Sequence, residues 1–285
     1  MATLRDIKRR ITAVRNTSKI TKAMKMVAAS KLRKAQTRML DMRPYADRMN
    51  AVISSLSGKA GREAHPLLAG RPRKAVELVV MTSDRGLCGA FNTNIVKSAE
   101  RLRAQLKAEG LEVSVSAIGK KAVDYYKRRS IPLRKAWTGY SGKLIYSNAQ
   151  EVASDLTENY LNESIDEVRL VYNQFKNIAQ QIVTVMRLLP ITPPEAQTED
   201  SDIIYEPSEE ELLGRFLPKN VEIQIFRGLL ESQASEEAAR MMAMENATKA
   251  ANDMISSLTL QYNKARQSSI TKELMDIVGG VEALK

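Results

Sequence analysis

The chain of 285 residues carries a net charge of +11, and 44% of its residues are hydrophobic but only 5% are aromatic. This composition suffices for a packed core and favours long helices over a β-sandwich. The single cysteine excludes an internal disulfide, and with the single histidine it leaves no basis for a zinc cluster. The positive charge predicts an acidic partner, for which nucleic acid, an anionic membrane surface and an acidic protein all qualify.

Neither end of the chain indicates a membrane segment. No apolar run approaches the roughly 18 residues of a membrane span. Residues 1–10 lack the apolar core of a secretory signal and lead directly into a helical pattern. We therefore expect no signal peptide, and the lone cysteine suits a reducing compartment.

Residues 1–58 are predicted to form one long helix. Its apolar positions recur at steps of four and three, the heptad period of a left-handed coiled coil. The seam runs through Ile7, Ile11, Val14, Ser18, Thr21, Lys25, Ala28, Leu32, Ala35, Met39, Met42, Ala46, Met49, Ile53 and Leu56. It is polar only at Ser18, Thr21 and Lys25. Pro44 is expected to kink or break the helix because it has no amide hydrogen to donate.

Residues 59–208 change character and alternate between strand and helix patterns. Strands are predicted at 75–81, 113–118, 168–175 and 181–188. Helices are predicted at 93–109, 120–129 and 149–162, residues 131–142 are ambiguous, and loops cover 60–73 and 190–207. Such alternation predicts a Rossmann-like α/β domain with a mostly parallel sheet.

Residues 209–285 are predicted to form a second long helix. From Met244 its seam runs through Thr248, Ala251, Ile255, Leu258, Tyr262 and Ala265, slips at residues 266–269, and resumes with Ile270, Leu274, Ile277, Val281 and Leu284. Such a slip alters the supercoil locally. If the two terminal helices pair antiparallel with flush ends, Ser18 lies near Gln267. The polar breaks of both helices would then share one height, where we expect the paired helices to meet something other than each other.

The turn after the first strand, Thr82–Asn92, is a candidate phosphate site. A glycine-bearing turn that opens a helix is able to cradle phosphate, but the chain has neither G-x-G-x-x-G nor the P-loop pattern. A structural turn is the favoured interpretation. Cys88 has no local histidine to activate it and is expected to be a small buried hydrophobe, and His65 is expected to be a surface residue. We predict no catalytic, cofactor-binding or metal-binding residue.

Two charged stretches point to partners. The N-terminal helix is basic nearly all round, through Arg5, Lys8, Arg9, Arg10, Arg15, Lys19, Lys22, Lys25, Lys31, Arg33, Lys34 and Arg38. It suits an acidic protein wall or nucleic acid, although no aromatic residue before Tyr45 offers a platform for base stacking. The acidic stretch at 200–211 is either a solvated loop before a helix or a docking segment for a basic partner. A basic nucleic-acid-binding coiled coil and a small α/β enzyme with helical arms therefore remain alternatives.

Five segments follow one another in a specific order: Arg5–Lys31, Ser83–Asn92, Glu245–Asn252, Tyr262–Gln267 and Ile270–Gly280. In this order they resemble the N-terminal helix, the central-domain hallmark and the C-terminal helix of the gamma-subunit family of F-type ATP synthases. The resemblance covers essentially the whole chain.

The chain departs from the family pattern at two points. Val281 stands where the family usually has alanine, a conservative change on the seam. Cys88 is the only cysteine, so the redox pair of the chloroplast branch is absent and thiol switching is not expected. Without a transit peptide, a bacterial source is expected.

The resemblance implies a rotor rather than a catalyst. It predicts three parts: a coiled-coil helix at 1–58, an α/β domain at 59–208 and a coiled-coil helix at 209–285. The paired helices would stand inside the alpha–beta hexamer, and the α/β domain would sit with epsilon on the membrane ring of c subunits. Ion flow would turn the ring and this subunit, driving the catalytic beta subunits through their states, without nucleic acid or cofactor. The location would be the cytoplasmic face of the bacterial inner membrane, held there only through the complex.

The resemblance also implies contact residues. Those expected to face loops of beta are Lys19, Thr21, Lys22, Met24, Lys25, Arg266 and Gln267. Those expected in the apolar sleeve of the alpha–beta hexamer are Leu274, Ile277 and Leu284. Tyr205 and Glu206 are expected to contact the c-ring or epsilon.

Overall fold

A computed structural model describes residues 3–60, 65–140, 142, 144–192 and 208–282. The chain forms two compact units, one from Met1–Ala28 and Met241–Lys285, the other from Ala29–Arg240. Helices α1 (Leu4–Ala60) and α5 (Glu209–Glu282) contribute residues to both units. No helix in the described ranges combines the length and apolar character needed to cross a bilayer. The expected boundaries after residues 58 and 208 stay a prediction.

Helix α1 confirms the heptad seam, because every predicted member is buried or half-buried. The helix runs without interruption through Pro44, so a break there is wrong, and a kink at Pro44 stays a prediction. A proline inside a helix costs about 3 kcal/mol. Met39, Ala46 and Met49, on either side of Pro44, are all at most 9% exposed, and burial of such apolar side chains offsets that cost.

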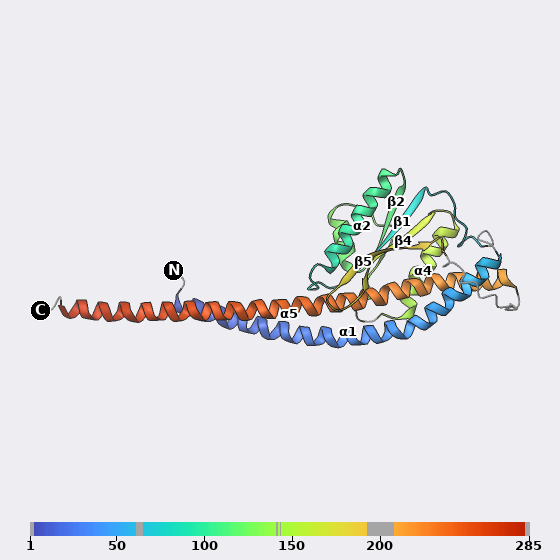
Figure 1. The fold of residues 1–285 in the computed structure, drawn as a ribbon. Coiled ribbons are helices and arrows are strands. Elements are labelled where there is room, and N and C mark those ends of the chain that lie inside the picture. The colour runs from blue at the N-terminus through green and yellow to red at the C-terminus, as the bar shows by residue number, and fades with distance from the viewer. Residues whose placement is uncertain (1–2, 61–64, 141, 143, 193–207, 283–285) are drawn as a thin grey trace. The chain divides into compact units, whose positions relative to one another are not determined.

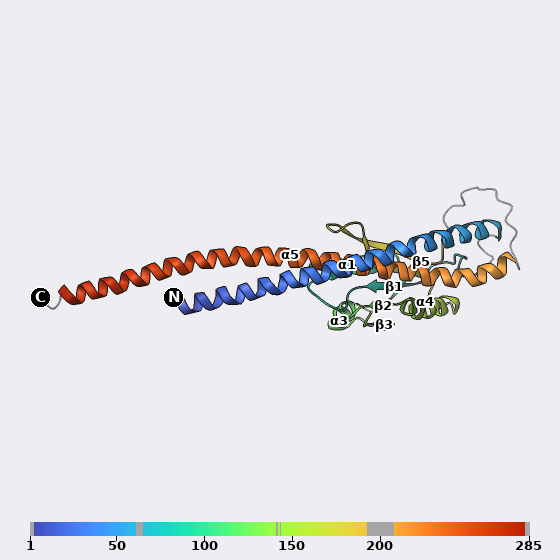
Figure 2. The same cartoon turned by 90° about the horizontal axis from the view of Figure 1, so that it is seen from below.

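In the first unit, α1 and α5 lie side by side and antiparallel, as predicted (Figures 1 and 2). The N-terminal end of α1 stops well short of the C-terminal end of α5 (Figure 1). On α5, Met244 and Ala251 are buried, and Ile255, Leu258 and Tyr262 are half-buried. Where α5 has α1 beside it, the two helices therefore pair along the predicted seam of α5.

The second unit is built on a five-stranded sheet. Its strands are β1 (Ala75–Met81), β2 (Glu112–Ile118), β3 (Ala136–Trp137), β4 (Glu167–Phe175) and β5 (Gln181–Leu189). They lie in the order β3-β2-β1-β4-β5, parallel except for the antiparallel pair β4–β5. The predicted α/β class and mostly parallel sheet are confirmed, and the ambiguous stretch holds the short edge strand β3. This is the doubly wound order with its switch point between β1 and β4.

Helices cover both faces of the sheet (Figure 1). On one face α2 (Phe91–Ala108) and α3 (Lys120–Arg128) pack Ile95 and Ala122 against Val80 and Val171. On the other, α4 (Tyr146–Leu161) and the parts of α1 and α5 in this unit contribute side chains to a cluster that includes Leu170. Both faces of the parallel strands are thus buried, which explains their nearly continuous apolar sequences.

Candidate functional site

The middle of the helix pair in the first unit is held by polar contacts instead of apolar ones. The hydroxyl of Ser18 donates to Asn252 Oδ1 at 2.9 Å, and the hydroxyls of Thr21 and Thr248 are 2.7 Å apart. Next along the helix, Lys25 Nζ lies 2.8 Å from Glu245 Oε1. We call these six residues the polar section. It arises because α1 carries Ser, Thr and Lys at three successive seam positions where apolar residues are expected.

The polar section corrects the predicted pairing register. Ser18 meets Asn252, so the expectation that it lies near Gln267 is wrong, and the two polar breaks do not share one height. The flush alignment fails because a heptad seam is repeated every seven residues and fits several offsets equally well. Hydrogen bonding between matched polar groups selects this offset, which leaves the C-terminal part of α5 beyond the start of α1.

The predicted contact residues of α1 divide by exposure. Lys19 and Lys22 are exposed, and they line an open groove beside the polar section together with Lys25 and Lys249. Thr21 is only 8% exposed and faces α5, so little of its surface is left for a partner. Met24 is half-buried. The structure thus presents a basic, grooved surface at this height of the helix pair.

The end of α5 presents apolar side chains to solvent. Leu274 is 58% exposed and Ile277 is 64% exposed, and Arg266 and Gln267 are also exposed. Exposed apolar side chains in a row mark a surface that another protein covers. Leu284, like Tyr205 and Glu206, lies outside the described residues.

The candidate phosphate turn lies at the switch point of the sheet, where ligands of doubly wound proteins bind. In this chain α5 occupies that position. The hollow between the carboxyl ends of β1 and β2 and residues such as Leu229 and Glu236 of α5 has a volume of about 30 Å³. Ligand pockets usually measure about 300–1,000 Å³, so this one has room for water but not for a nucleotide.

Glycine at position 119, after β2, is required by close packing with the turn. Gly119 has a φ of +94°, and a Cβ there would come within 2.1 Å of the carbonyl oxygen of Thr82. The hydroxyl of Thr82 accepts the backbone N–H of Ala122 at 2.8 Å. The side chain of Thr82 therefore ties this turn to the start of α3, which supports the structural interpretation of the motif.

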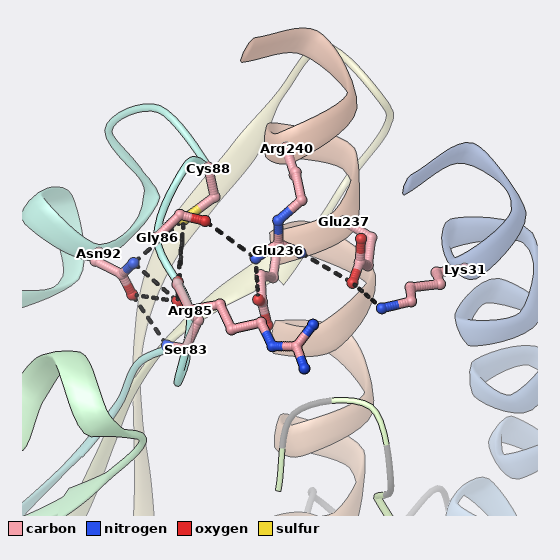
Figure 3. A network of polar contacts seen from close by, with 9 residues as sticks. All are labelled: Lys31, Ser83, Arg85, Gly86, Cys88, Asn92, Glu236, Glu237 and Arg240. Carbon is pink, nitrogen blue, oxygen red and sulfur yellow. Dashed lines mark hydrogen bonds and ion pairs between the residues drawn. The ribbon is translucent and has the colours of Figure 1, made fainter. Parts of the chain in front are cut away.

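The rest of the turn is closed by its own side chains (Figure 3). Asn92 Nδ2 donates to the Ser83 hydroxyl at 2.8 Å and to Cys88 Sγ at 3.2 Å. Cys88 is 2% exposed. Burial and then the negative charge of Glu236 raise the pKa of the Cys88 thiol. A buried thiol kept protonated is a poor nucleophile, as expected from the sequence.

Sequence reasoning missed the charged cluster on α5 that packs against this turn (Figure 3). Arg240 forms an ion pair with Glu236, lies 2.9 Å from Glu237 Oε1, and approaches the carbonyl oxygen of Gly86 at 3.5 Å. Lys31 of α1 lies 3.9 Å from the same Glu237 oxygen. Burial raises the pKa of Glu236 although Arg240 opposes it. The spacing of four and three residues to Arg240 was visible in the sequence, but it is also typical of exposed helical pairs.

Comparison with known proteins identifies the family. A family model described as ATP synthase matches residues 3–284. The ATP synthase gamma chain of Geotalea daltonii is 48% identical over all of both chains, and that of Syntrophus aciditrophicus is 50% identical over 100% of this chain and 99% of its own.

Solved structures agree in fold. The chain resembles one from the central stalk and c-ring of Tetrahymena thermophila mitochondrial ATP synthase, with a TM-score of 0.60, 28% identity, and coverage of 80% of this chain and 99% of that one. A chain of the Euglena gracilis mitochondrial ATP synthase in its OSCP/F1/c-ring structure gives a TM-score of 0.68 at 20% identity, covering 99% and 94%. The chain belongs to the ATP synthase gamma-chain family, whose members are the rotor shaft of that enzyme complex and work in association with its other subunits.

Proposed function

We propose that this rotor subunit couples ion-driven rotation of a membrane c-ring to the conformational cycle of catalytic beta subunits. The observation that carries the proposal is the unpaired end of α5. Leu274, Met275 and Ile277 are 58–65% exposed there, with no α1 beside them. A helix that presents such side chains is favoured inside an apolar sleeve, and the alpha–beta hexamer is the partner we assign to it.

ATP chemistry then takes place on beta, and this chain supplies only motion. In support, the hollow between α5 and the carboxyl ends of β1 and β2, next to the switch point, measures about 30 Å³ and has no room for a nucleotide. The subunit affects catalysis by presenting a different side of the helix pair to each beta subunit as it turns.

The contacts with beta divide between two heights. Lys19, Lys22 and Lys25, with Thr21 and Met24 beside them, offer a basic groove to acidic loops. Arg266 and Gln267 offer exposed polar groups farther along α5. Two separate contact zones replace the single height that the sequence suggested.

Three predicted contact residues lie outside the described residues. We propose that Tyr205 and Glu206 contact the c-ring or epsilon, and that Leu284 joins Leu274 and Ile277 in the alpha–beta sleeve. The complex would place the chain on the cytoplasmic face of a bacterial inner membrane, without direct insertion.

Reconstitution tests the proposal. The full chain is mixed with alpha and beta subunits of a related bacterial enzyme, and ATP hydrolysis of the assembled hexamer is measured. We expect assembly and activation of hydrolysis. A chain that binds DNA in a salt-dependent manner but neither joins nor activates the hexamer would overturn the proposal in favour of nucleic-acid binding.

A further inference from the structure

One corner of the sheet gathers three arginines around a single buried carboxylate. A hollow of about 320 Å³ there is lined by Arg73, Glu167, Arg169, Val185 and Arg187. We call it the arginine hollow. It lies where β4 begins, at the opposite end of the parallel strands from the turn that follows β1. It is therefore separate from the switch point.

Two of these arginines lie opposite each other on neighbouring strands. Arg169 on β4 and Arg187 on β5 are direct partners in the antiparallel register. Like charges in that arrangement destabilise a sheet unless an anion compensates them. A negatively charged group near this pair of arginines would therefore stabilise the sheet.

The buried carboxylate of Glu167 compensates only part of the positive charge of these arginines. Glu167 is 2% exposed and accepts Nε of Arg169 at 2.5 Å and Nη1 of Arg73 at 3.4 Å. Arg187 instead donates to the neutral hydroxyl of Thr192. Within the residues that the structure describes, no ion pair includes Arg187. Three guanidinium groups and one carboxylate give the lining a charge of about +2, or about +1 with Glu109, which is 3.9 Å from Arg73.

The surroundings favour a protein segment over a small anion. Val185 is 41% exposed in the lining and lies on the same face of β5 as Arg187. Strand β5 ends the sheet, and no described strand pairs with its outer edge. An edge strand offers backbone groups to an added strand. Phosphate would use neither the apolar side chain of Val185 nor this edge, whereas an extended peptide uses both.

We propose that the arginine hollow and the outer edge of β5 dock an extended, acidic segment of another subunit of the complex. The partner's backbone pairs with β5, and its carboxylates bind Arg187 and Arg169, with a bidentate geometry available to each guanidinium. An apolar side chain of the segment packs on Val185. The inference rests on the proposed function, because that function supplies a partner subunit.

Arginine reactivity tests this docking. The isolated full chain and the purified assembled complex are treated with an arginine-selective dicarbonyl reagent, and modified residues are quantified by mass spectrometry. We expect Arg187 and Arg73 to react in the isolated chain and to be protected in the complex. Arg101, exposed on α2, serves as the control and should react equally in both. Equal reactivity of Arg187 in both samples would overturn the proposal.

A second experiment distinguishes a protein segment from a small anion as the ligand of the arginine hollow. Inorganic phosphate at millimolar concentration is added to the isolated chain before the reagent. Protection of Arg187 by phosphate as strong as that in the complex would replace the proposed peptide dock with an anion site.

Charge-reversal variants identify the partner subunit. They also distinguish a failure of the docking proposal from a failure of the proposed function. Arg187→Glu should release one specific subunit from the complex at a lower salt concentration than wild type, whereas Arg101→Glu should not. If the wild-type chain itself fails to assemble, the proposed function fails. If it assembles but both variants retain every subunit equally, only the docking proposal fails.

Discussion

Ser18 donates a hydrogen bond to Asn252 across the helix pair, at 2.9 Å. This contact and the two that follow it, at Thr21–Thr248 and Lys25–Glu245, fix how far α1 reaches along α5. They explain why the end of α5 has no α1 beside it. The polar section therefore sets the length of the helix that is offered to partner subunits.

Replacing both Thr21 and Thr248 with valine should leave the helix pair as stable or stabilise it by up to about 1 kcal/mol, because both partners of one hydrogen bond are removed together. Thr21→Val alone should cost up to about 1 kcal/mol, since it leaves the Thr248 hydroxyl without its cross-helix partner. Thr248 keeps its bond to the Met244 carbonyl, which limits that cost. Hydrogen exchange at residues 18–28 measures the local stability. A double variant as unstable as the sum of the two single variants would refute this view.

The apolar seam could be predicted from the sequence because heptad spacing alone decides which face of a helix is buried. Every predicted position from Ile7 to Leu56 on that seam is indeed covered. The offset between the helices could not be predicted, since shifts by one heptad preserve the seam. It depends on which polar side chains meet, as Ser18 and Asn252 do.

Long-range contacts explain the other features that the sequence did not predict correctly. The predicted break at Pro44 ignored the packing of Met39 and Ala46 that carries the helix through it. Arg240 could not be told from an exposed helical arginine before the fold placed the Gly86 turn against it. Likewise, Arg169 and Arg187 are 18 positions apart in the sequence, and only the strand register makes them opposite partners.

Replacing Arg266 and Gln267 with alanine should impair turnover of the assembled complex more than folding of the chain. Both side chains are exposed, so the free energy of unfolding should change by no more than about 0.5 kcal/mol for each. Thermal unfolding of the chain and ATP hydrolysis by the complex are measured side by side. Parallel losses of stability and activity would argue for a structural role instead.

Arg240→Ala should destabilise the second unit by about 3–5 kcal/mol, because it leaves the buried carboxylate of Glu236 without its cation and leaves Glu237 with only Lys31, at 3.9 Å. Arg215→Ala is a matched control. Arg215 pairs with Glu211 at the same spacing of four residues, but both side chains are largely exposed, so the cost should stay below about 0.5 kcal/mol. Urea unfolding of the full chain distinguishes the two, and similar midpoints for both variants would show that the buried cluster contributes little.

Asp166→Asn should remove a pH-dependent part of the stability. Burial alone would raise the pKa of Asp166, but the backbone N–H groups of Ala75 and Lys74 and the side chain of Arg71 outweigh it and hold that pKa below its ordinary value. A lowered folded-state pKa stabilises the protein above the unfolded pKa, and the benefit disappears as the pH falls through the folded pKa.

The unfolding midpoints of wild type and Asp166→Asn should therefore differ most near neutral pH and begin to approach each other as the pH falls below about 4, the ordinary value for an aspartate. Asp41→Asn, at an exposed position of α1, is the control and should show no such convergence. A difference between wild type and Asp166→Asn that stays constant from pH 7 to pH 3 would contradict the assigned role of the carboxylate.

Direct observation of rotation tests whether this chain is a turning shaft. Cys88 is buried, so Ala104→Cys on the exposed side of α2 provides one accessible thiol for a probe. The labelled chain is assembled with immobilised alpha and beta subunits, and the probe is followed by single-molecule microscopy while ATP is supplied. We expect rotation in one direction that stops when ATP is removed. ATP hydrolysis by the assembled complex with a stationary probe would contradict this expectation.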